Sequence, residues 1–466
     1  MGGDELQRLM SVNRRSTLSP ARSPEDVRTD IMDLVEEYFR VAHRAKPFVP
    51  GESSVPISGR TFDATDVKSL VDSALEFWLT SGRYNDMFQA NLAKRVGARY
   101  ALTVNSGSSA NLAAFSALTS PLLRDRKLEP GSEIITAAAG FPTTVNPMML
   151  WGMVPVFIDI DIPTYNILPQ TVEAAITPKT RAIMAAHTLG NPFDAVRIAE
   201  IAKRHKLFLI EDCCDALGAT IDGRHVGTFG DIGTLSFYPA HHITMGEGGA
   251  VFTSDPMLRR AIEAFRDWGR DCYCDPGKEN TCKRRFDWQL GDLPYGYDHK
   301  YIYSHMGFNM KITDMQAAVG VSQLTHLDEF IAARRRNFAR LKTGLADLEE
   351  FFVMPEPTSG AEPSWFGLLL TVRDNSPFDR NAIVRHLDEH KIGTRLLFGG
   401  NLTRQPYMKG RQYRVHGALE NSDRVVDSTF WIGVFPGIGE PEVEYVLDVI
   451  HRFCREAAAH GREGRA

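Results

Sequence analysis

Short apolar runs alternate with helical stretches through the middle of the chain, and this alternation constrains the fold more than any other feature. Helical patterns cover residues 110–118 and 195–204, and a further one ends near residue 150. Strands that alternate with helices favour a mainly parallel sheet with helices on both faces. We therefore expect an α/β fold, with strands near residues 100–104, 133–136, 154–159, 182–186, 207–212 and 233–238.

The chain has 466 residues, which is enough for two or more domains. We expect an N-terminal arm over residues 1–60 with a helix near 30–43, a large domain over 61–325, and a small C-terminal α+β domain over 326–466. A helix from residue 314 to about 348 should join the two domains. It contains an arginine run at 334–336, for which we expect a solvated helix face.

The overall composition is that of a soluble globular protein. Hydrophobic residues make up 43% and charged residues 24%, and a net charge of -5 provides no basic field for nucleic acid. No window approaches ~18 continuous apolar residues, and the N-terminus lacks a signal peptide's apolar core. We expect a cytoplasmic enzyme or binding protein that contacts neither nucleic acid nor membrane.

Polar residues follow several of the predicted strands. The turn at residues 105–109 joins a strand to a helix, and such a turn binds anions through free backbone N–H groups, although serine there is also a routine helix cap. Asp212 ends another strand, where it could equally cap the strand or form a salt bridge. Because active sites of such sheets lie at the carboxyl ends of strands, we expect one pocket there. Its candidate residues are Ser108, Ser109, Phe141, Asp212, Ser236 and His241.

Residues 236–249 read as strand, tight loop, strand, with two adjacent histidines and a Gly-Glu-Gly-Gly run. This segment resembles the one that carries the Schiff-base lysine in sugar aminotransferases of the DegT/DnrJ/EryC1/StrS family. His241 stands at the lysine position and His242 follows it. A lysine can hold pyridoxal phosphate covalently, whereas an imidazole cannot but can move protons near neutral pH.

The family resemblance covers roughly residues 60–450 and implies an aspartate-aminotransferase-like fold of type I. It implies that Ser108, Ser109 and Ser236 hold the cofactor phosphate. It further implies that Phe141 stacks on the cofactor ring and that Asp212 pairs with the protonated ring nitrogen.

Residues 307–318 resemble the family's Gly-x-Asn-x-Arg-Met segment. Lys311 stands where many members have arginine, and Ile312 replaces the methionine. In the family this asparagine reaches the cofactor phosphate of the other subunit. Asn309 therefore implies a homodimer with shared active sites.

Five of the six cysteines fall into two groups. Cys213 and Cys214 follow Asp212, and three more lie in a loop near residues 270–285 that is rich in proline, glycine and asparagine. From Cys214 onward the intervals are 57, one and seven residues, to Cys272, Cys274 and Cys282. Four thiolates suit either zinc or a 2Fe-2S cluster, and spacing alone leaves zinc, cluster and free thiols open. Cys454 lies in an apolar helical pattern and is expected in the core.

The position of Cys214, at most roughly 7 Å along the chain from Asp212, favours a redox centre beside the cofactor ring. This cysteine set together with His241 resembles the iron–sulfur, pyridoxamine-phosphate-dependent hexulose 3-dehydrases of the family. The spacing in that subgroup selects Cys214 rather than Cys213 as the fourth ligand.

The resemblance implies removal of the 3-hydroxyl from an NDP-4-keto-6-deoxyhexose or NDP-4-keto-2,6-dideoxyhexose. His241 would abstract a proton from pyridoxamine phosphate, and the cluster would pass electrons from a reductase, ferredoxin or flavodoxin. Alternatives are a pyridoxal-phosphate aminotransferase, an iron-free 3-dehydrase and a non-catalytic binding protein. Residues 394–406 resemble the sugar-nucleotide region, but the choice between CDP and dTDP stays open.

Overall fold

The computed structural model describes residues 22–44, 46–274 and 277–463. The described residues before Lys46 form one unit, and the described residues from Lys46 onward form the second. In the first unit, α2 spans Pro24–Ala42 and none of its residues is buried. It begins earlier than predicted because Ser23 and Asp26 form a reciprocal capping box before a proline in the first turn.

A mixed sheet of eight strands forms the centre of the second unit, in the order β1-β9-β8-β5-β4-β2-β3-β14. β9 is antiparallel to both neighbours, and every other pair is parallel. The prediction of a mainly parallel α/β sheet is therefore confirmed. The strands are β1 Tyr100–Val104, β2 Glu133–Ala137, β3 Val154–Ile158, β4 Thr180–Ala186, β5 Phe208–Asp212, β8 Ile232–Ser236, β9 Gly249–Thr253 and β14 Arg414–Val415.

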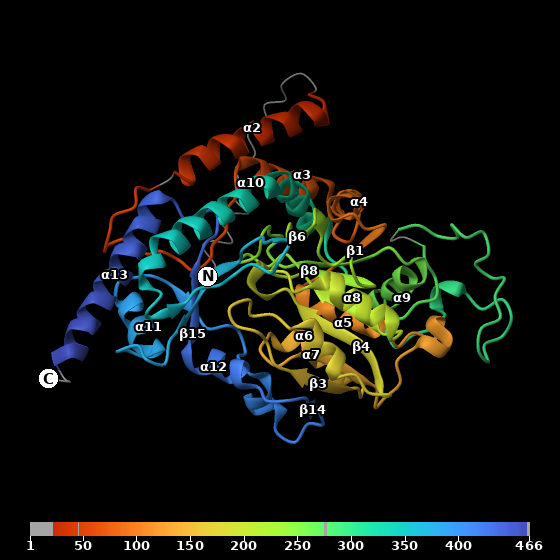
Figure 1. The fold of residues 1–466 in the computed structure, drawn as a ribbon. Helices are drawn as coiled ribbons and strands as arrows, with labels where there is room; N and C mark the ends of the chain where they lie inside the picture. Colours follow the sequence, from red (N-terminus) through yellow and green to blue (C-terminus); the bar gives the residue numbers. More distant parts are fainter. Residues whose placement is uncertain (1–21, 45, 275–276, 464–466) are drawn as a thin grey trace. The chain divides into compact units, whose positions relative to one another are not determined.

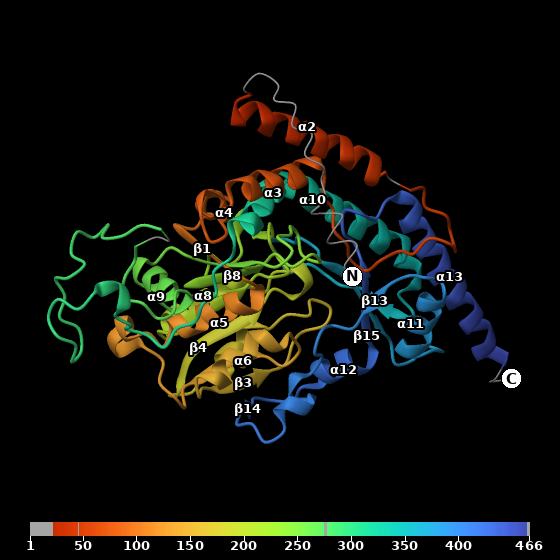
Figure 2. The same ribbon diagram turned by 180° about the vertical axis from the view of Figure 1, so that it is seen from behind.

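Helices cover both faces of this sheet, as Figures 1 and 2 show. Alternate strand residues enter different cores: Ile135 packs in one apolar cluster and Ile134 in the other. The Ile135 core includes α4 Arg83–Val96, α7 Pro169–Ala174, α8 Ala195–Arg204 and the first half of α10 Asp314–Gly344. The Ile134 core includes α5 Gly107–Ala117, α6 Pro142–Leu150 and α9 Pro256–Arg266. α3 Ala64–Glu76 packs against α10.

The C-terminal region builds a smaller antiparallel sheet in the order β10-β12-β15-β13, with a third apolar core. Cys454 lies in that core and is fully buried, as predicted. α10 contributes to the large core at one end and to this core at the other. The elements are β10 Phe352–Val353, β12 Gly367–Val372, β13 Thr394–Arg395, β15 Thr429–Gly433, α11 Arg380–Glu389, α12 Glu420–Ser428 and α13 Glu440–Glu463.

Short elements complete the described chain, and the domain boundaries near residues 60 and 325 stay a prediction. A small sheet joins β11 Ala361–Glu362, β6 Thr220–Ile221 and β7 Arg224–His225. The 3-10 helices are η1 Pro121–Arg126, η2 Thr188–Gly190, η3 His299–Tyr301, η4 Ala346–Leu348, η5 Leu402–Arg404 and η6 Pro406–Met408.

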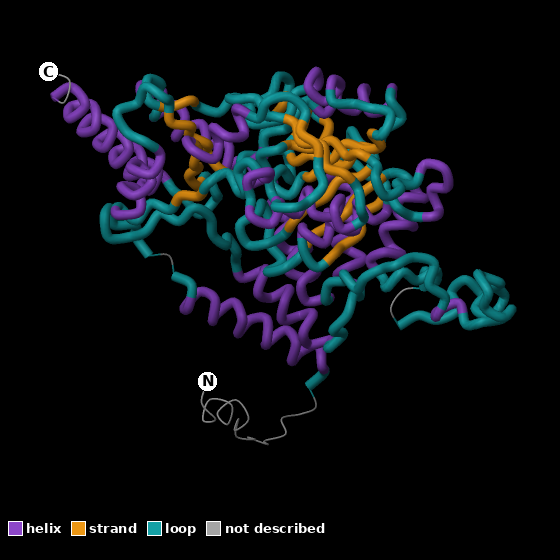
Figure 3. Tube along the Cα trace, turned by 90° about the horizontal axis from the view of Figure 1, so that it is seen from below, coloured by secondary structure: helices purple, strands orange, loops and turns teal. Residues whose placement is uncertain are grey.

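The segment between α9 and α10 carries three of the cysteines and is almost entirely loop (Figure 3). Its only helical turn among the described residues is η3. Isolated bridges Asp267–Asn309 and Arg270–Tyr303 hold the base of this segment together. We call residues 267–313 the cysteine loop.

The expectation of a solvated arginine run is wrong for Arg334, which is only 2% exposed. Its guanidinium donates to the carbonyl oxygens of Trp365 and His241, at 3.4 and 3.0 Å. α10 passes between two cores, so one member of the run faces the interior, where two loops supply acceptors. Arg336 remains exposed.

Within the described residues, we find no helix with the length and apolar character that a membrane crossing requires.

Candidate active site

A cavity of about 850 Å³ lies at the carboxyl ends of the parallel strands. It is reached by β5, which ends at Asp212, by β8, which ends at Ser236, and by the turn after β1. The structure therefore brings most of the predicted residues to one place. Those lining the cavity are Ser108, Phe141, Asp212, Cys214, Ser236 and His241.

Asp212 is a buried carboxylate with a fixed orientation. Its Oδ2 accepts hydrogen bonds from Asn111 Nδ2 at 2.8 Å and Thr144 Oγ1 at 2.7 Å. Its Oδ1 accepts one from the backbone N–H of Cys214 at 3.1 Å. Thr234 Oγ1 donates to Asn111 Oδ1 at 2.7 Å, which orients that amide. These donors satisfy the oxygens of a carboxyl group that is only 4% exposed.

The first turn of α5 forms an anion cradle beside Asp212. Ser106 caps the helix by accepting from the N–H of Ser109 at 3.1 Å, and the N–H groups of this turn have no intrahelical acceptor. A Cβ at Gly107 would lie 2.5 Å from Ser236 Cβ and 3.1 Å from Cys214 Sγ, so glycine is required there. Ser108 faces the cavity, whereas the hydroxyl of Ser109 receives a hydrogen bond from Ser106 Oγ.

The two adjacent histidines have different surroundings. The side chain of His241 lines the cavity, and its Nδ1 lies 3.7 Å from Asp215 Oδ1. His242 is 2% exposed, lies outside this cavity and uses Nε2 to bond the carbonyl oxygen of Ser364 at 2.8 Å. This placement selects His241 as the histidine that can reach a bound molecule.

Two charged residues, Asp215 and Arg334, lie close to His241. Burial, with a smaller contribution from Arg334, lowers the pKa of His241 to about 3. Burial and the nearby Asp212 raise the pKa of Asp215 to about 8. Burial lowers the pKa of Arg334 to about 9, against the opposing effect of Asp215. At neutral pH the His241 imidazole is uncharged and can accept a proton.

Four residues that organise this site are not among the candidates predicted from the sequence: Asn111, Thr144, Asp215 and Arg334. Asp215 could have been noticed, because it follows Asp212 by three residues in the turn after a strand. Arg334 offered no such signal, since it meets His241 from a helix 93 residues further along the chain.

The far side of the cavity combines aromatic rings with a cation. Phe141 is 46% exposed and packs edge-on against Phe398 with ring centroids 5.6 Å apart. Arg395 of β13 and Trp431 of β15 also line the cavity. The predicted sugar-nucleotide segment therefore does contribute to the wall.

The three cysteines of the cysteine loop line a separate small pocket with Arg285, His299 and Lys300. Burial raises the pKa of the Cys274 thiol, but hydrogen bonds from Thr281 and Cys272 outweigh it and leave the pKa lowered. Thr281 Oγ1 donates to Cys274 Sγ at 3.0 Å. Three thiols that line one pocket, one of them with a lowered pKa, suit a metal or an iron–sulfur cluster.

Cys214 lies apart from this trio, at the main cavity, where burial and the charge of Asp212 raise the pKa of its thiol. Cys213 is fully buried and its Sγ faces the carbonyl oxygen of Glu211 at 3.5 Å. Across the described residues, no cysteine belongs to a group of three or more candidate ligand atoms within 4.8 Å of one another. Cys214 as fourth ligand therefore stays a prediction.

Asn309 does not reach the cavity of its own chain. It is exposed, and its Oδ1 accepts a hydrogen bond from Lys311 Nζ at 2.9 Å. Its side chain is open to another molecule, and its predicted role in a partner subunit remains a prediction.

Comparison with known proteins gives this fold and cavity a context. Residues 61–451 match the DegT/DnrJ/EryC1/StrS aminotransferase family. The lipopolysaccharide biosynthesis protein RfbH of Salmonella typhimurium is 55% identical over 428 residues, 92% of this chain and 98% of that protein. A dTDP-4-dehydro-2,6-dideoxy-D-glucose 3-dehydratase of Saccharopolyspora spinosa is 51% identical over 93% of both chains. A solved structure of E. coli GDP-4-keto-6-deoxy-D-mannose-3-dehydratase with bound hydrated PLP is 28% identical, with a TM-score of 0.76 over 85% of this chain and 98% of that one.

Proposed function

The chain belongs to the DegT/DnrJ/EryC1/StrS aminotransferase family, and we propose that it is a 3-dehydratase of a nucleotide-linked 4-keto-deoxyhexose. The observation that carries this proposal is His241. By the resemblance of residues 236–249 to the family's segment, it stands at the position of the family's lysine, and it lies in one cavity with Asp212 and the anion cradle of α5. An ordinary aminotransferase needs a lysine at that position.

The cavity residues fit a pyridoxal- or pyridoxamine-type cofactor. The first turn of α5 and Ser236 would bind its phosphate, and Phe141 would lie against its ring. Asp212, with its orientation fixed by Asn111 and Thr144, would hold a proton on the ring nitrogen. When bound, pyridoxamine phosphate supplies an amine that can condense with the sugar ketone and a ring that takes up electrons.

His241 would act as the general base at this site. Its unprotonated imidazole would take the proton from carbon 4′ of bound pyridoxamine phosphate, while the sugar's C3 hydroxyl would leave as hydroxide with its bonding electrons. Asp215, 3.7 Å from Nδ1, would orient the ring and stabilise its charged form. When the cofactor is bound, its protonated ring nitrogen would share a proton with Asp212 and offset the negative charge of that carboxylate. Since Asp212 is one cause of the raised Asp215 pKa, cofactor binding should favour the ionised form of Asp215.

The substrate would occupy the remainder of the cavity. A volume of about 850 Å³ leaves room for a hexose and part of a nucleotide beside the cofactor. Arg395 offers a cation for the diphosphate, and Trp431 and Phe398 offer apolar surfaces for the sugar. The nucleotide of the substrate, CDP or dTDP, and the presence of a C2 hydroxyl on its sugar stay open.

We propose that the cysteine loop holds a 2Fe-2S cluster through Cys272, Cys274 and Cys282, with Cys214 as fourth ligand. The pocket that the first three share supports this assignment. The cluster would supply electrons singly from an external reductase, ferredoxin or flavodoxin. Iron and sulfide analysis of anaerobically purified protein tests it, and zinc without iron would exclude the redox step.

We also propose a homodimer in which Asn309 serves the cavity of the partner, supported by its exposure outside its own cavity. We also propose a cytoplasmic location, because none of the six cysteines, all of them described, forms a disulfide, and reduced thiols persist in a reducing compartment.

The experiment that tests the function replaces His241 by asparagine. Turnover of a nucleotide-linked 4-keto sugar should fall by ~10²–10⁴-fold, the range for loss of a general base. The matched control is H242Q, since a glutamine amide can still donate to the Ser364 carbonyl oxygen. Unchanged loss of the C3 hydroxyl in H241N would exclude His241 from the mechanism.

A further inference from the structure

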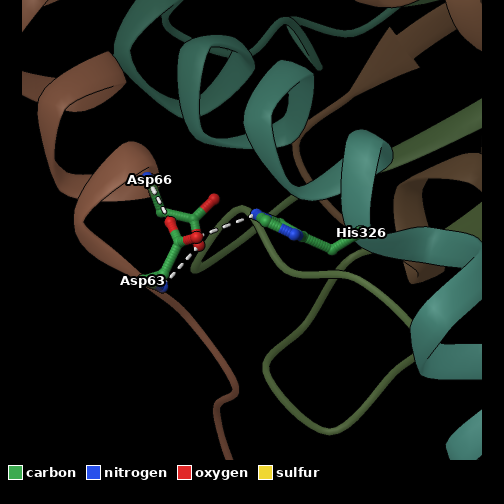
Figure 4. Close-up of side chains that lie close together, drawn as sticks. All are labelled: Asp63, Asp66 and His326. Atoms are coloured by element: carbon green, nitrogen blue, oxygen red, sulfur yellow. Dashed lines mark hydrogen bonds and ion pairs between the residues drawn. The ribbon is translucent and has the colours of Figure 1, made fainter.

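A second group of ligand-type side chains lies outside the active-site cavity, where the start of α3 meets α10. Asp63, Asp66 and His326 converge there, and one ligand atom from each lies within 4.8 Å of the other two (Figure 4). Asp63 is the N-cap of α3, Asp66 lies in its first turn, and His326 lies in the middle of α10.

The helix cap explains only one oxygen of each carboxylate. Asp63 Oδ1 accepts from the N–H groups of Thr65 and Asp66, at 2.7 and 3.3 Å. Asp66 Oδ2 accepts from the N–H of Asp63 at 3.0 Å and from Gln323 Nε2 at 2.8 Å. The remaining atoms are Asp63 Oδ2, which lies 3.5 Å from His326 Nε2, and Asp66 Oδ1.

Two of the three candidate ligand atoms are buried without a hydrogen-bond partner in the described part of the chain, and Asp63 Oδ2 has the ion pair with His326. Asp66 is only 3% exposed, yet among the described residues its Oδ1 has no hydrogen-bond partner, and neither has the buried Nε2 of His326. The hydroxyl oxygen of Thr61 is a third buried atom without a partner among the described residues. Thr61 is close to the site, because Gln323 Nε2 donates both to its carbonyl oxygen and to Asp66 Oδ2. Unsatisfied buried polar atoms are costly, and two adjacent carboxylates repel each other. A cation between the two carboxylates would give the unsatisfied atoms a partner and offset the repulsion between the carboxylates.

We propose that Asp63 Oδ2, Asp66 Oδ1 and His326 Nε2 bind a divalent transition-metal ion, with water completing the shell. Ligand bonds of about 2.1 Å place neighbouring tetrahedral ligands about 3.4 Å apart, close to the 3.5 Å between Asp63 Oδ2 and His326 Nε2. Carboxylates with one imidazole suit Mn²⁺ or Zn²⁺. The Asp63 side chain is 49% exposed, which provides an entry path.

The ion would fasten α3 to α10 and steady the segment that carries His241. Gln323, which bonds Asp66 through Nε2, accepts at Oε1 a hydrogen bond from the N–H of Thr244 at 3.2 Å. Thr244 lies three residues beyond His241. The ion would therefore have a structural role: it would stabilise, through Asp66 and Gln323, the loop that carries His241.

Mn²⁺ titration of the full-length protein, followed by the EPR signal of free Mn²⁺, tests the proposal. Mn²⁺ is the probe because thiolates of the cysteine loop select softer metals. Wild type should bind one Mn²⁺ per chain at this site, and D66N and H326Q should each weaken binding at least tenfold. The matched control is H451Q, which alters another histidine–aspartate pair on the same chain and should bind Mn²⁺ as wild type does.

Mn²⁺ should also raise the thermal unfolding midpoint of wild type and H451Q but not of D66N or H326Q. H326Q keeps the test valid if D66N does not fold, because His326 is partly exposed and outside the capping box. Absence of Mn²⁺ binding by wild type, or equal binding by wild type and H326Q, would overturn the proposal. His326 would then form its ion pair with Asp63 and bind no metal.

Discussion

The active-site cavity and the cysteine loop hold their functional side chains in different ways. The cavity is built on strand ends and a helix terminus, and Asp212 receives hydrogen bonds from two side chains and a backbone N–H. The cysteine loop has little regular structure and depends on ion pairs, such as those of Arg285 with Asp298 and Glu279. The cavity residues are therefore held by hydrogen bonds within the chain, whereas the loop should gain much of its order from the metal centre that we propose for it.

The largest expected effect follows from a change in the cysteine loop that leaves the cavity unaltered. Replacing Cys274 by serine should remove the cluster and with it all reductive turnover, while cofactor affinity in the cavity stays unchanged. Iron content and cofactor binding, measured on the same preparation, check this. The control is C213A, which removes a thiol outside both pockets and should keep its iron. Full iron content in C274S would contradict the assignment.

A lysine at position 241 tests the cavity alone. H241K should allow covalent capture of pyridoxal phosphate, because the side chain would enter the cavity at the position predicted to correspond to the family's lysine. Mass spectrometry after borohydride reduction should show the cofactor attached to this residue, with the iron content of the cysteine loop unaltered. If no reduced cofactor adduct forms at residue 241, the side chain at this position does not face the reacting carbon of the cofactor.

Asp215 should have a smaller effect than His241, since it acts through the imidazole. D215N should lower kcat by ~10–100-fold with little change in KM, because it removes the orienting carboxylate but not the base. D215E offers a conservative comparison and should recover part of the rate. Equal activity in D215N and wild type at every pH would remove Asp215 from the proposed mechanism.

The smallest effect is on the pH dependence of stability without cofactor. Burial raises the pKa of Asp215 to about 8, so the folded state holds this proton more tightly than the unfolded state, and stability falls as pH rises toward 8. Burial lowers the pKa of His241 to about 3, which makes stability rise with pH up to about 6.5.

Above pH 6.5 only the Asp215 contribution remains of these two. Its slope is at most about 1.4 kcal/mol per pH unit. Urea unfolding between pH 6.5 and 8 should therefore give a flatter profile for D215N than for wild type. Parallel profiles would show that the Asp215 pKa is ordinary.

The same contrast explains what could be predicted from the sequence. Asp212, Ser106 and the helix α5 follow from local patterns, because strands, caps and turns are encoded by neighbouring residues. The contact of Arg334 with His241 joins residues 93 positions apart and has no local signature. The same holds for the hydrogen bonds of Asn111 and Thr144 to Asp212, which depend on how helices pack over the sheet.

The arginine run shows the opposite error. Three consecutive charges predict a solvated face on average, yet α10 lies between two cores, and Arg334 finds carbonyl acceptors in the interior. The burial of one charge in such a run depends on tertiary packing and not on composition.

The most direct test is the product made by the protein loaded with pyridoxamine phosphate and an electron donor. It should be incubated with a nucleotide-linked 4-keto-6-deoxyhexose, or its 2,6-dideoxy form, and analysed by mass spectrometry and NMR. We predict a sugar that has lost its C3 oxygen and retains the C4 ketone. A C4 amino sugar with the C3 hydroxyl intact would contradict the account, because it would make the chain an aminotransferase despite His241.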